Sequence, residues 1–426
     1  MGLRSTQFRT RGPFSGEDVS GKSNDAWHVN QIGYKVSTPG IIATGGHVQD
    51  WTAPDGTRYR THMFAGTGTF VVTGLGKWGN AIDYLVVGGG GGSPGWNSGG
   101  GGGGGVRTNV PGTVTKDSMP TTLVPGGSVS IAGASMTATI GTYTVTIGAG
   151  GANNGGSSPG QGGPGGQTEF YPTASPGYPN AEWIRAPGGG GAGGAHSPTT
   201  GGYPGLDGAG GGGGGWSDNT GQPGGSGNPS PQQDPNHPAR LGYPGAGDGS
   251  YGQSGGGGGS GEAGYPYTYT NPLPNPTAND VRGKGGDGVF STIIISPPTY
   301  DSGTGYCWGG AGGGNIRTSP DGGPDARKGG KGGGGRGGNS GPITPLAGGP
   351  GYNDGGNSSP GATMRGGHGG LYTGGGGGGT SSPNPTGANG GSGTVIIRYK
   401  VDPDGNQPFG NNPGPMISKA NPGRVA

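Results

Sequence analysis

One stretch near the start of the chain has the residue types and spacing of a phosphate-binding loop. Gly16, Gly21, Lys22 and Ser23 meet the pattern G-x-x-x-x-G-K-S, in which backbone amides and a lysine surround the phosphates of a nucleotide. That pattern needs a buried strand before it and a helix after it. Here residues 10–13 read TRGP, and a non-helical stretch bearing Trp and His follows. The context therefore argues against nucleotide binding.

The other residues with catalytic or metal-binding chemistry are dispersed. Asp402, Asp404 and Asn406 imitate the start of a calcium loop, but Gln407 stands where that loop needs glycine. The single cysteine, Cys307, excludes an internal disulfide framework and a multi-thiolate metal site. No H-x-x-x-H spacing occurs among the histidines, which are His28, His47, His62, His196, His237 and His368. No general base, nucleophile and orienting group can be assembled, so we expect no enzyme, no catalytic residue, no cofactor and no metal site.

Glycine dominates the composition. The chain has 121 Gly and 40 Pro in 426 residues and is only 26% hydrophobic, so an ordinary core cannot fill its length. A strict Gly-X-Y register never lasts, which excludes collagen. The 24 basic and 22 acidic residues are too nearly balanced to favour a self-repelling disordered chain or nucleic-acid binding. We interpret the small basic cluster as a solvated edge; it comprises Arg327, Lys328, Lys331 and Arg336.

The longest glycine runs indicate how such a chain can be ordered. Fixing a residue costs about 1–2 kcal/mol, and glycine has no side chain to bury in return. Helices of the polyproline II type have three residues per turn and no internal hydrogen bonds, so their N–H and C=O groups are free to bond neighbouring helices. Each such bond contributes about 0.5–1.5 kcal/mol. We therefore expect a bundle of polyglycine II helices built from residues 88–92, 99–105, 210–215, 255–259 and 374–379.

Short runs rich in Val, Ile, Thr and Tyr predict strands. They cover residues 58–64, 69–73, 82–87, 106–110, 129–140, 143–147, 289–296 and 394–401. Because the last run lies far downstream, we expect it to return and pair with the early strands, which makes the glycine-rich region a long insertion. The predicted fold class is mostly irregular plus β: a small β base carrying a bundle of polyglycine II helices, with almost no α-helix.

The same composition shifts predict the domain boundaries. Residues 1–57 are polar and poor in periodicity and are interpreted as an N-terminal arm that orders against a partner. The predicted units that follow are residues 58–148, a β base with the first glycine runs; 149–392, the bundle with aromatic and proline-rich loops; 393–401, the closing strand; and 402–426, a tail. No stretch approaches eighteen apolar residues and no secretory h-region opens the chain, so we expect neither membrane insertion nor a signal peptide.

Aromatic residues gather in the segments between glycine runs. They cannot enter a polyglycine lattice and are expected on its rim or ends. Tyr and Trp supply a large amphipathic contact area at low entropy cost, which suits a binding surface or the face of a sugar. Alternatively they cap the bundle and shield glycine from water. The candidate receptor-binding residues are Tyr171, Tyr178, Trp183, Tyr203, Trp216, Tyr243, Tyr265, Tyr267, Tyr269, Tyr306 and Trp308.

Four stretches carry a resemblance to a known family. Residues 68–74 read GTFVVTG, 82–92 read IDYLVVGGGGG, 143–151 read YTVTIGAGG and 390–399 read GGSGTVIIRY. Together they resemble the glycine-rich domain of tail fibre and receptor-binding (adhesin) proteins of tailed bacteriophages. The resemblance implies a β base with a polyglycine II bundle on the virion, whose distal loops contact the host; here these correspond to loops within about residues 168–360.

The resemblance and the composition together lead to an expected function. We expect a non-enzymatic virion protein, a tail fibre or appendage made in the cytoplasm of the bacterial host. Residues 1–57 would attach it to other virion proteins, and the loops would bind a bacterial surface glycan or an outer-membrane protein. A homotrimer is a further alternative, because fibres are often trimeric. The long arm and proline-rich loops leave tip adhesin, fibre shaft and neck or capsid appendage open.

Two other functions are weighed against adhesion. The first is a virion spacer or decoration protein that binds no receptor. The second is an ice-binding or matrix protein with a flat polyglycine II face, against which the lack of regular Thr or small-residue spacing argues.

Overall fold

The computed structural model describes most of the chain between residues 40 and 401. The described residues are 40–53, 55–76, 79–110, 135–154, 160–173, 183–195, 202–216, 222–227, 241–247, 253–266, 282–294, 305–315, 327–338, 347–358, 365–381 and 386–401. Within these ranges the regular structure consists of strands alone, without a helix. The expectation of a mostly β and irregular chain is confirmed.

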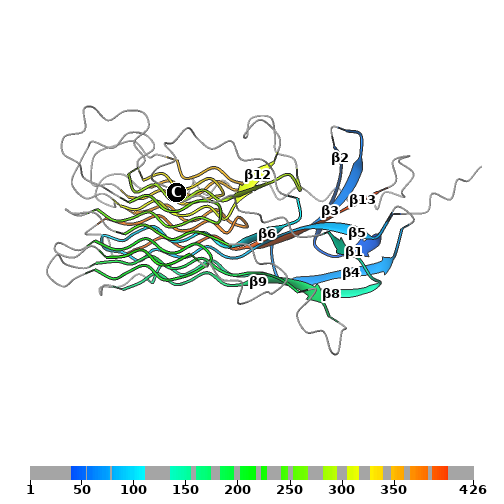
Figure 1. Cartoon of the computed structure of the whole chain (residues 1–426), viewed down its shortest axis with the longest axis horizontal. Helices are drawn as coiled ribbons and strands as arrows, with labels where there is room; N and C mark the ends of the chain where they lie inside the picture. Colours follow the sequence, from blue (N-terminus) through cyan, green and yellow to red (C-terminus); the bar gives the residue numbers. More distant parts are fainter. Residues whose placement is uncertain are drawn as a thin grey trace, which may run out of the picture.

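Two antiparallel sheets make up the β base, on the right in Figure 1. The six-stranded sheet has the order β2(His47–Thr52), β3(Arg58–Phe64), β13(Thr394–Lys400), β5(Ala81–Val87) and β6(Val106–Thr108), with β7(Met136–Thr137) also pairing β5. The five-stranded sheet has the order β1(Ile42–Thr44), β4(Gly68–Gly74), β8(Gly141–Thr146), β9(Thr168–Pro172) and β10(Ile184–Ala186). A separate hairpin joins β11(Val289–Ser291) to β12(Tyr306–Trp308).

The predicted return of the last strand is confirmed. β13 lies between β3 and β5, pairing Ile396 with Met63 on one side and with Leu85 on the other. Both faces of β13 are buried, since Val395 and Ile397 enter the core between the sheets while Ile396 packs toward the β11–β12 hairpin. Alternate side chains of a strand point to opposite faces, so burial on both sides explains its continuous apolar sequence.

The β base begins earlier and takes in more of the chain than expected. β1 and β2, which fall inside the expected arm, pair with β4 and β3. β9 and β10 fall in the region expected to be loops of the bundle, yet they extend the five-stranded sheet. Of the expected strand over residues 129–140, only Met136–Thr137 is a described strand, and 129–134 lie outside the described residues.

The glycine runs lie side by side along the long axis of the molecule, beside the sheets (Figure 1). We call them the glycine bundle. Its best-connected member is run 99–105, whose successive amides donate to three neighbouring runs in turn. Every third amide returns to the same neighbour, so that the acceptors fall within residues 187–193, 255–258 and 374–377. The carbonyls of the same run accept from residues 88–91, from residues 210–213 and from Gly312.

The interior of the glycine bundle has no room for a side chain. A Cβ built on Gly103 would overlap the carbonyl oxygen of Gly309, and one on Gly101 would overlap that of Gly91. Backbone hydrogen bonding and this close approach therefore replace a side-chain core along these runs.

The basic cluster is not the solvated edge that we expected. Arg327 and Arg336 are only 1% and 2% exposed, and Lys328 and Lys331 are half-buried. The prediction is wrong because the cluster belongs to runs of the bundle, where the backbones of Arg327 and Arg336 pair with neighbouring runs and their side chains are buried.

Candidate functional site

The end of the glycine bundle opposite the β base is marked by one tight turn. Run 88–92 leaves β5 and run 99–105 returns to β6, so residues 93–98 between them lie at the far end. Trp96 and Asn97 in this turn have φ values of 58° and 43°, in the left-handed region that few non-glycine residues occupy. We call this the distal end.

Hydrogen bonds to Trp96 and Asn97 show that several other runs also end at the distal end. Ala195 N–H donates to the Trp96 carbonyl at 3.0 Å, and Trp216 N–H donates to the Asn97 carbonyl at 3.2 Å. Ser254 Oγ also donates to the Asn97 carbonyl, at 3.0 Å. Runs far apart in the sequence therefore finish at the same level.

A buried layer of small polar side chains closes the lattice at this level. Ser98 Oγ donates to the Pro94 carbonyl at 2.7 Å and accepts from Thr380 N–H at 2.9 Å. Ser254 Oγ lies 2.9 Å from Asn315 Oδ1, and Asn315 Nδ2 donates to the Thr380 carbonyl at 2.7 Å. Ser98, Ser254, Asn315 and Thr380 are all fully buried. These side chains supply bonds that the next glycine would have made, so they end the runs while pairing the backbone groups named above.

The two ends of the bundle are connected differently. On the side of the β base several runs turn within a few residues, as at 260–262, 331–333 and 371–373. At the distal end, the described residues flank the segments 155–159, 196–201, 217–221, 248–252, 267–281, 316–326, 339–346, 359–364 and 382–385. Segments 111–134, 174–182, 228–240 and 295–304 are flanked instead by residues on the side of the β base. The distal end thus gathers nine of these thirteen segments, although the four on the side of the β base include the longest one.

Three predicted site residues belong to the distal half. Tyr203 is 41% exposed there, and its N–H donates to the Gly194 carbonyl. Trp216 is only 4% exposed, and Tyr265 is buried with its hydroxyl donating to Glu262 Oε1 at 2.5 Å. Tyr203 is therefore the one of the three that offers contact area to a partner. Tyr178, Tyr267 and Tyr269 lie outside the described residues.

The other predicted site residues lie toward the β base. Tyr243, Tyr306 and Trp308 are buried, and Trp308 stacks on Tyr352 with ring centroids 5.6 Å apart. These rings pack within the protein, as the capping alternative expected, and present no receptor-binding area.

Tyr171 and Trp183 form a half-buried cluster at one edge of the five-stranded sheet. Their rings meet edge to face at 4.8 Å, and the Arg185 guanidinium lies 3.3 Å from the centroid of Trp183. Glu169 lies 3.6 Å from Arg185 Nε. The cation covers part of the indole face, so this cluster is a smaller contact surface than its aromatic content suggests.

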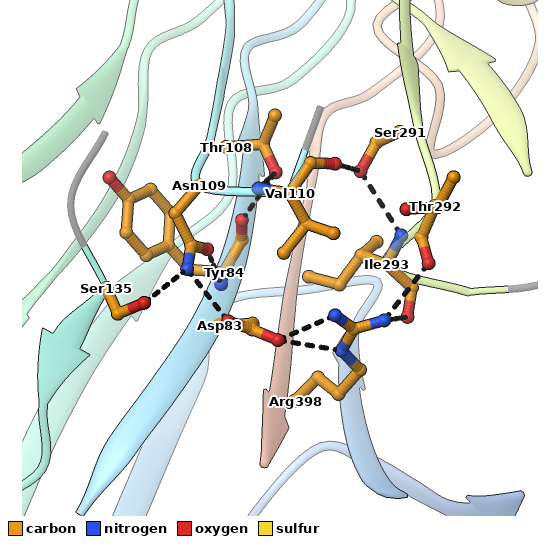
Figure 2. Close-up of polar contacts among 10 residues, drawn as sticks. All are labelled: Asp83, Tyr84, Thr108, Asn109, Val110, Ser135, Ser291, Thr292, Ile293 and Arg398. Carbon is orange, nitrogen blue, oxygen red and sulfur yellow. Dashed lines mark hydrogen bonds and ion pairs between the residues drawn. The ribbon is translucent and has the colours of Figure 1, made fainter. Parts of the chain in front are cut away.

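An extended charged network joins the six-stranded sheet to the β11–β12 hairpin instead of opening a site (Figure 2). Arg398 donates to Asp83 Oδ2 through Nε at 3.0 Å and Nη2 at 2.6 Å, and its Nη1 donates to the carbonyls of Thr292 and Ile293. Asn109 Nδ2 donates to Asp83 Oδ1 at 2.8 Å. Every strong acceptor here is already used, so the network fastens β5, β13 and the segment after β11 together.

The described residues provide neither a metal cluster nor a membrane-spanning helix. The described ranges hold no group of three or more His, Cys, Asp or Glu placed to bind a metal ion. No helix with the length and hydropathy of a membrane span occurs among them. A scan against protein-family models and a search of curated proteins gave no match.

The distal polar layer is the feature that sequence reasoning missed. Its members look like ordinary turn residues, but each directly precedes or follows a glycine run, as Ser98 precedes 99–105 and Thr380 follows 374–379. That position next to a run is the signal that would have identified them.

Proposed function

We propose that the glycine runs are polyglycine II helices. The support is the hydrogen-bond repeat of run 99–105, in which residues three apart donate to the same neighbour. A helix with three residues per turn brings every third amide to the same side, whereas the two-residue repeat of a strand does not. The close backbone contacts, which exclude a Cβ, agree with this assignment.

We further propose that the chain is a bacteriophage virion structural protein, a tail fibre or appendage that binds the bacterial host surface through segments at the distal end of the bundle. The observation that carries the proposal is that nine of the thirteen segments between described runs are flanked by residues at the end opposite the sheets. Loops fixed on a rigid scaffold are where binding residues concentrate. The resemblance at residues 68–74, 82–92 and 390–399 supports the virion assignment.

The attachment and binding roles fall at opposite ends in this proposal. Residues preceding the β base attach the protein to other virion proteins, and the distal end meets a surface glycan or an outer-membrane protein. Run 99–105 pairs its backbone within one chain, so the proposal does not require a trimer. Several weakly binding copies on one particle would gain affinity through avidity.

The burial of predicted contact residues supports a second candidate function. Trp216, Tyr243, Tyr265, Tyr306 and Trp308 are all under 8% exposed. A bundle whose aromatics serve its own packing would suit a virion spacer or decoration protein that binds no receptor.

Adsorption competition distinguishes the two functions. Candidate host cells are preincubated with the purified full-length protein, phage carrying it are added, and unadsorbed phage are counted. Dose-dependent blocking is the expected result. If the folded protein fails to block at any concentration on cells that the phage adsorbs to, the spacer function is favoured.

A further inference from the structure

We propose that Arg365 and His368 form a binding site for one oxyanion group, a carboxylate, sulfate or phosphate, on the flank of the glycine bundle. The two side chains direct hydrogen-bond donors at each other with no acceptor between them. This site is independent of whether the chain binds host cells.

The spacing of the two residues suits the three-residue repeat of the bundle. Two glycines separate them, and Gly366 and Gly367 are buried in the lattice, whereas His368 is exposed and Arg365 is half-buried. Residues three apart lie on the same side of a three-residue helix. Both side chains therefore project from one flank of run 365–370.

One N–H donor at His368 has no acceptor, as the hydrogen bonds of its two ring nitrogens show. Asn389 N–H donates to His368 Nδ1 at 2.9 Å, so in the neutral ring the proton is on Nε2. His368 Nε2 lies 2.9 Å from Arg365 Nη2, and a guanidinium nitrogen can only donate. Moving the ring proton to Nδ1 merely transfers the conflict to the Asn389 amide. An oxyanion accepting from both Nε2 and Nη2 removes the conflict.

Neighbouring runs hold the two donors in place. Arg365 Nε donates to the Gly387 carbonyl at 3.1 Å, which leaves the other face of the guanidinium available. Asn153 bonds the same segment through Nδ2 to the Gly387 carbonyl and through its N–H to Asn389 Oδ1. Among the described residues Arg365 forms no ion pair with a carboxylate. The positive charge is thus anchored without a countercharge.

The negative charge of a bound oxyanion should change the pKa of His368, which can be measured. Desolvation of the ring by the chain packed around it, and then the nearby Arg365 charge, lower the pKa of His368, although the residue as a whole is exposed. A bound oxyanion would favour the imidazolium and raise that pKa, by about one unit for a charge within hydrogen-bond distance. Loss of Arg365 would remove the main attraction for the anion.

The test follows His368 in the full-length protein by NMR. The pKa of His368 is measured in sulfate, in phosphate and in glucuronate, with chloride at equal ionic strength as the reference. We expect the oxyanions to raise it by about one unit relative to chloride, and Arg365→Gln to abolish the rise. Lys400→Gln, which removes an exposed cation of the β base, should leave the rise unchanged.

The outcomes also separate the source of the anion. Saturation by glucuronate at tenfold lower concentration than by sulfate or phosphate would indicate the acidic group of a sugar, and equal concentrations would indicate free inorganic anions. Identical pKa values in all four salts would overturn the proposal. So would an equal loss of response in Lys400→Gln, because the effect would then be general screening.

Discussion

The Tyr399 hydroxyl donates to His62 Nε2 at 3.0 Å in the core between the two sheets of the β base. His62 Nδ1 donates to the Gly45 carbonyl at 2.7 Å, so the fully buried neutral ring uses one nitrogen as donor and the other as acceptor. The His62 ring and the ring of Phe70 from the opposite sheet meet edge to face, with centroids 5.1 Å apart. A second ring proton would reverse the direction of the Tyr399 hydrogen bond and place a charge in this core.

The β base should lose stability as the pH falls from about 6.5 to 4. Burial lowers the pKa of His62 from 6.5 to about 4, so between these values the unfolded chain is protonated and the folded chain is not. Stability from the neutral ring is complete above pH 6.5, declines with pH, and levels off below 4. The total loss is roughly 3 kcal/mol at 1.4 kcal/mol per pKa unit. Guanidinium denaturation between pH 7.5 and 4 measures it.

A glutamine provides the control for this pH dependence. His62→Gln can still donate and accept but cannot titrate, so its unfolding free energy should vary less between pH 6.5 and 4. An equal pH slope in the two proteins would assign the titration to another group.

Removing the Arg398 guanidinium should destabilise the protein. Arg398→Met keeps the aliphatic stem but leaves Asp83 Oδ2 and the carbonyls of Thr292 and Ile293 without their donor (Figure 2). We expect a loss of about 2–4 kcal/mol, because a partly buried charge and two acceptors lose their bonds. Equilibrium denaturation at pH 7 measures it.

Arg60→Met is the matched comparison. Arg60 makes a two-point contact with Asp50 at 2.7 and 2.8 Å, but its side chain is more exposed than that of Arg398, and it bonds no carbonyl of the described residues. Arg60→Met should lower the free energy of unfolding by less than Arg398→Met does. The reverse order would argue against the two carbonyl bonds as the source of the effect.

The central strands of the base could be predicted from sequence because burial imposes a pattern on them. The expected strand over residues 58–64 coincides with β3, and the apolar run at 394–401 identified β13. β2 was missed, since its sequence HVQDWT belongs to an edge strand that is stabilised by pairing with β3 and is largely exposed. Backbone pairing of this kind leaves little trace in side-chain hydrophobicity.

The candidate site could be predicted only in part. Composition indicated that aromatics lie at the rim or ends of the bundle, and Tyr203 does lie exposed at the distal end. The sequence could not show that Trp216 is drawn inside, because its burial depends on where run 210–215 ends relative to Asn97 of another run. Register between runs of similar sequence is not encoded in any one of them.

Tyr203→Ala should weaken adsorption blocking without changing thermal stability. Its exposed ring contributes contact area at the distal end and little to packing. A residue that binds at the centre of an interface costs more than 1 kcal/mol on truncation, so we expect roughly fivefold weaker blocking. Leu371→Ala is the control, because Leu371 is similarly exposed at 47% but lies in a turn on the side of the β base. Equal effects of the two changes would argue against a distal binding surface.

Adding a single methyl group should destabilise the protein in the interior of the glycine bundle but not at its surface. In Gly103→Ala the new Cβ would overlap the Gly309 carbonyl, and the surrounding backbone belongs to several runs that cannot move independently. Overpacking of this kind costs about 1–3 kcal/mol even among side chains, and rigid backbone should place the loss at the upper end or above.

Gly160→Ala adds the same methyl where no atom lies within 4 Å. It should be neutral or stabilise by up to about 1 kcal/mol, because it restricts the unfolded chain. Thermal denaturation of the two variants measures the difference. Similar melting temperatures would mean that the runs are not packed against each other in solution.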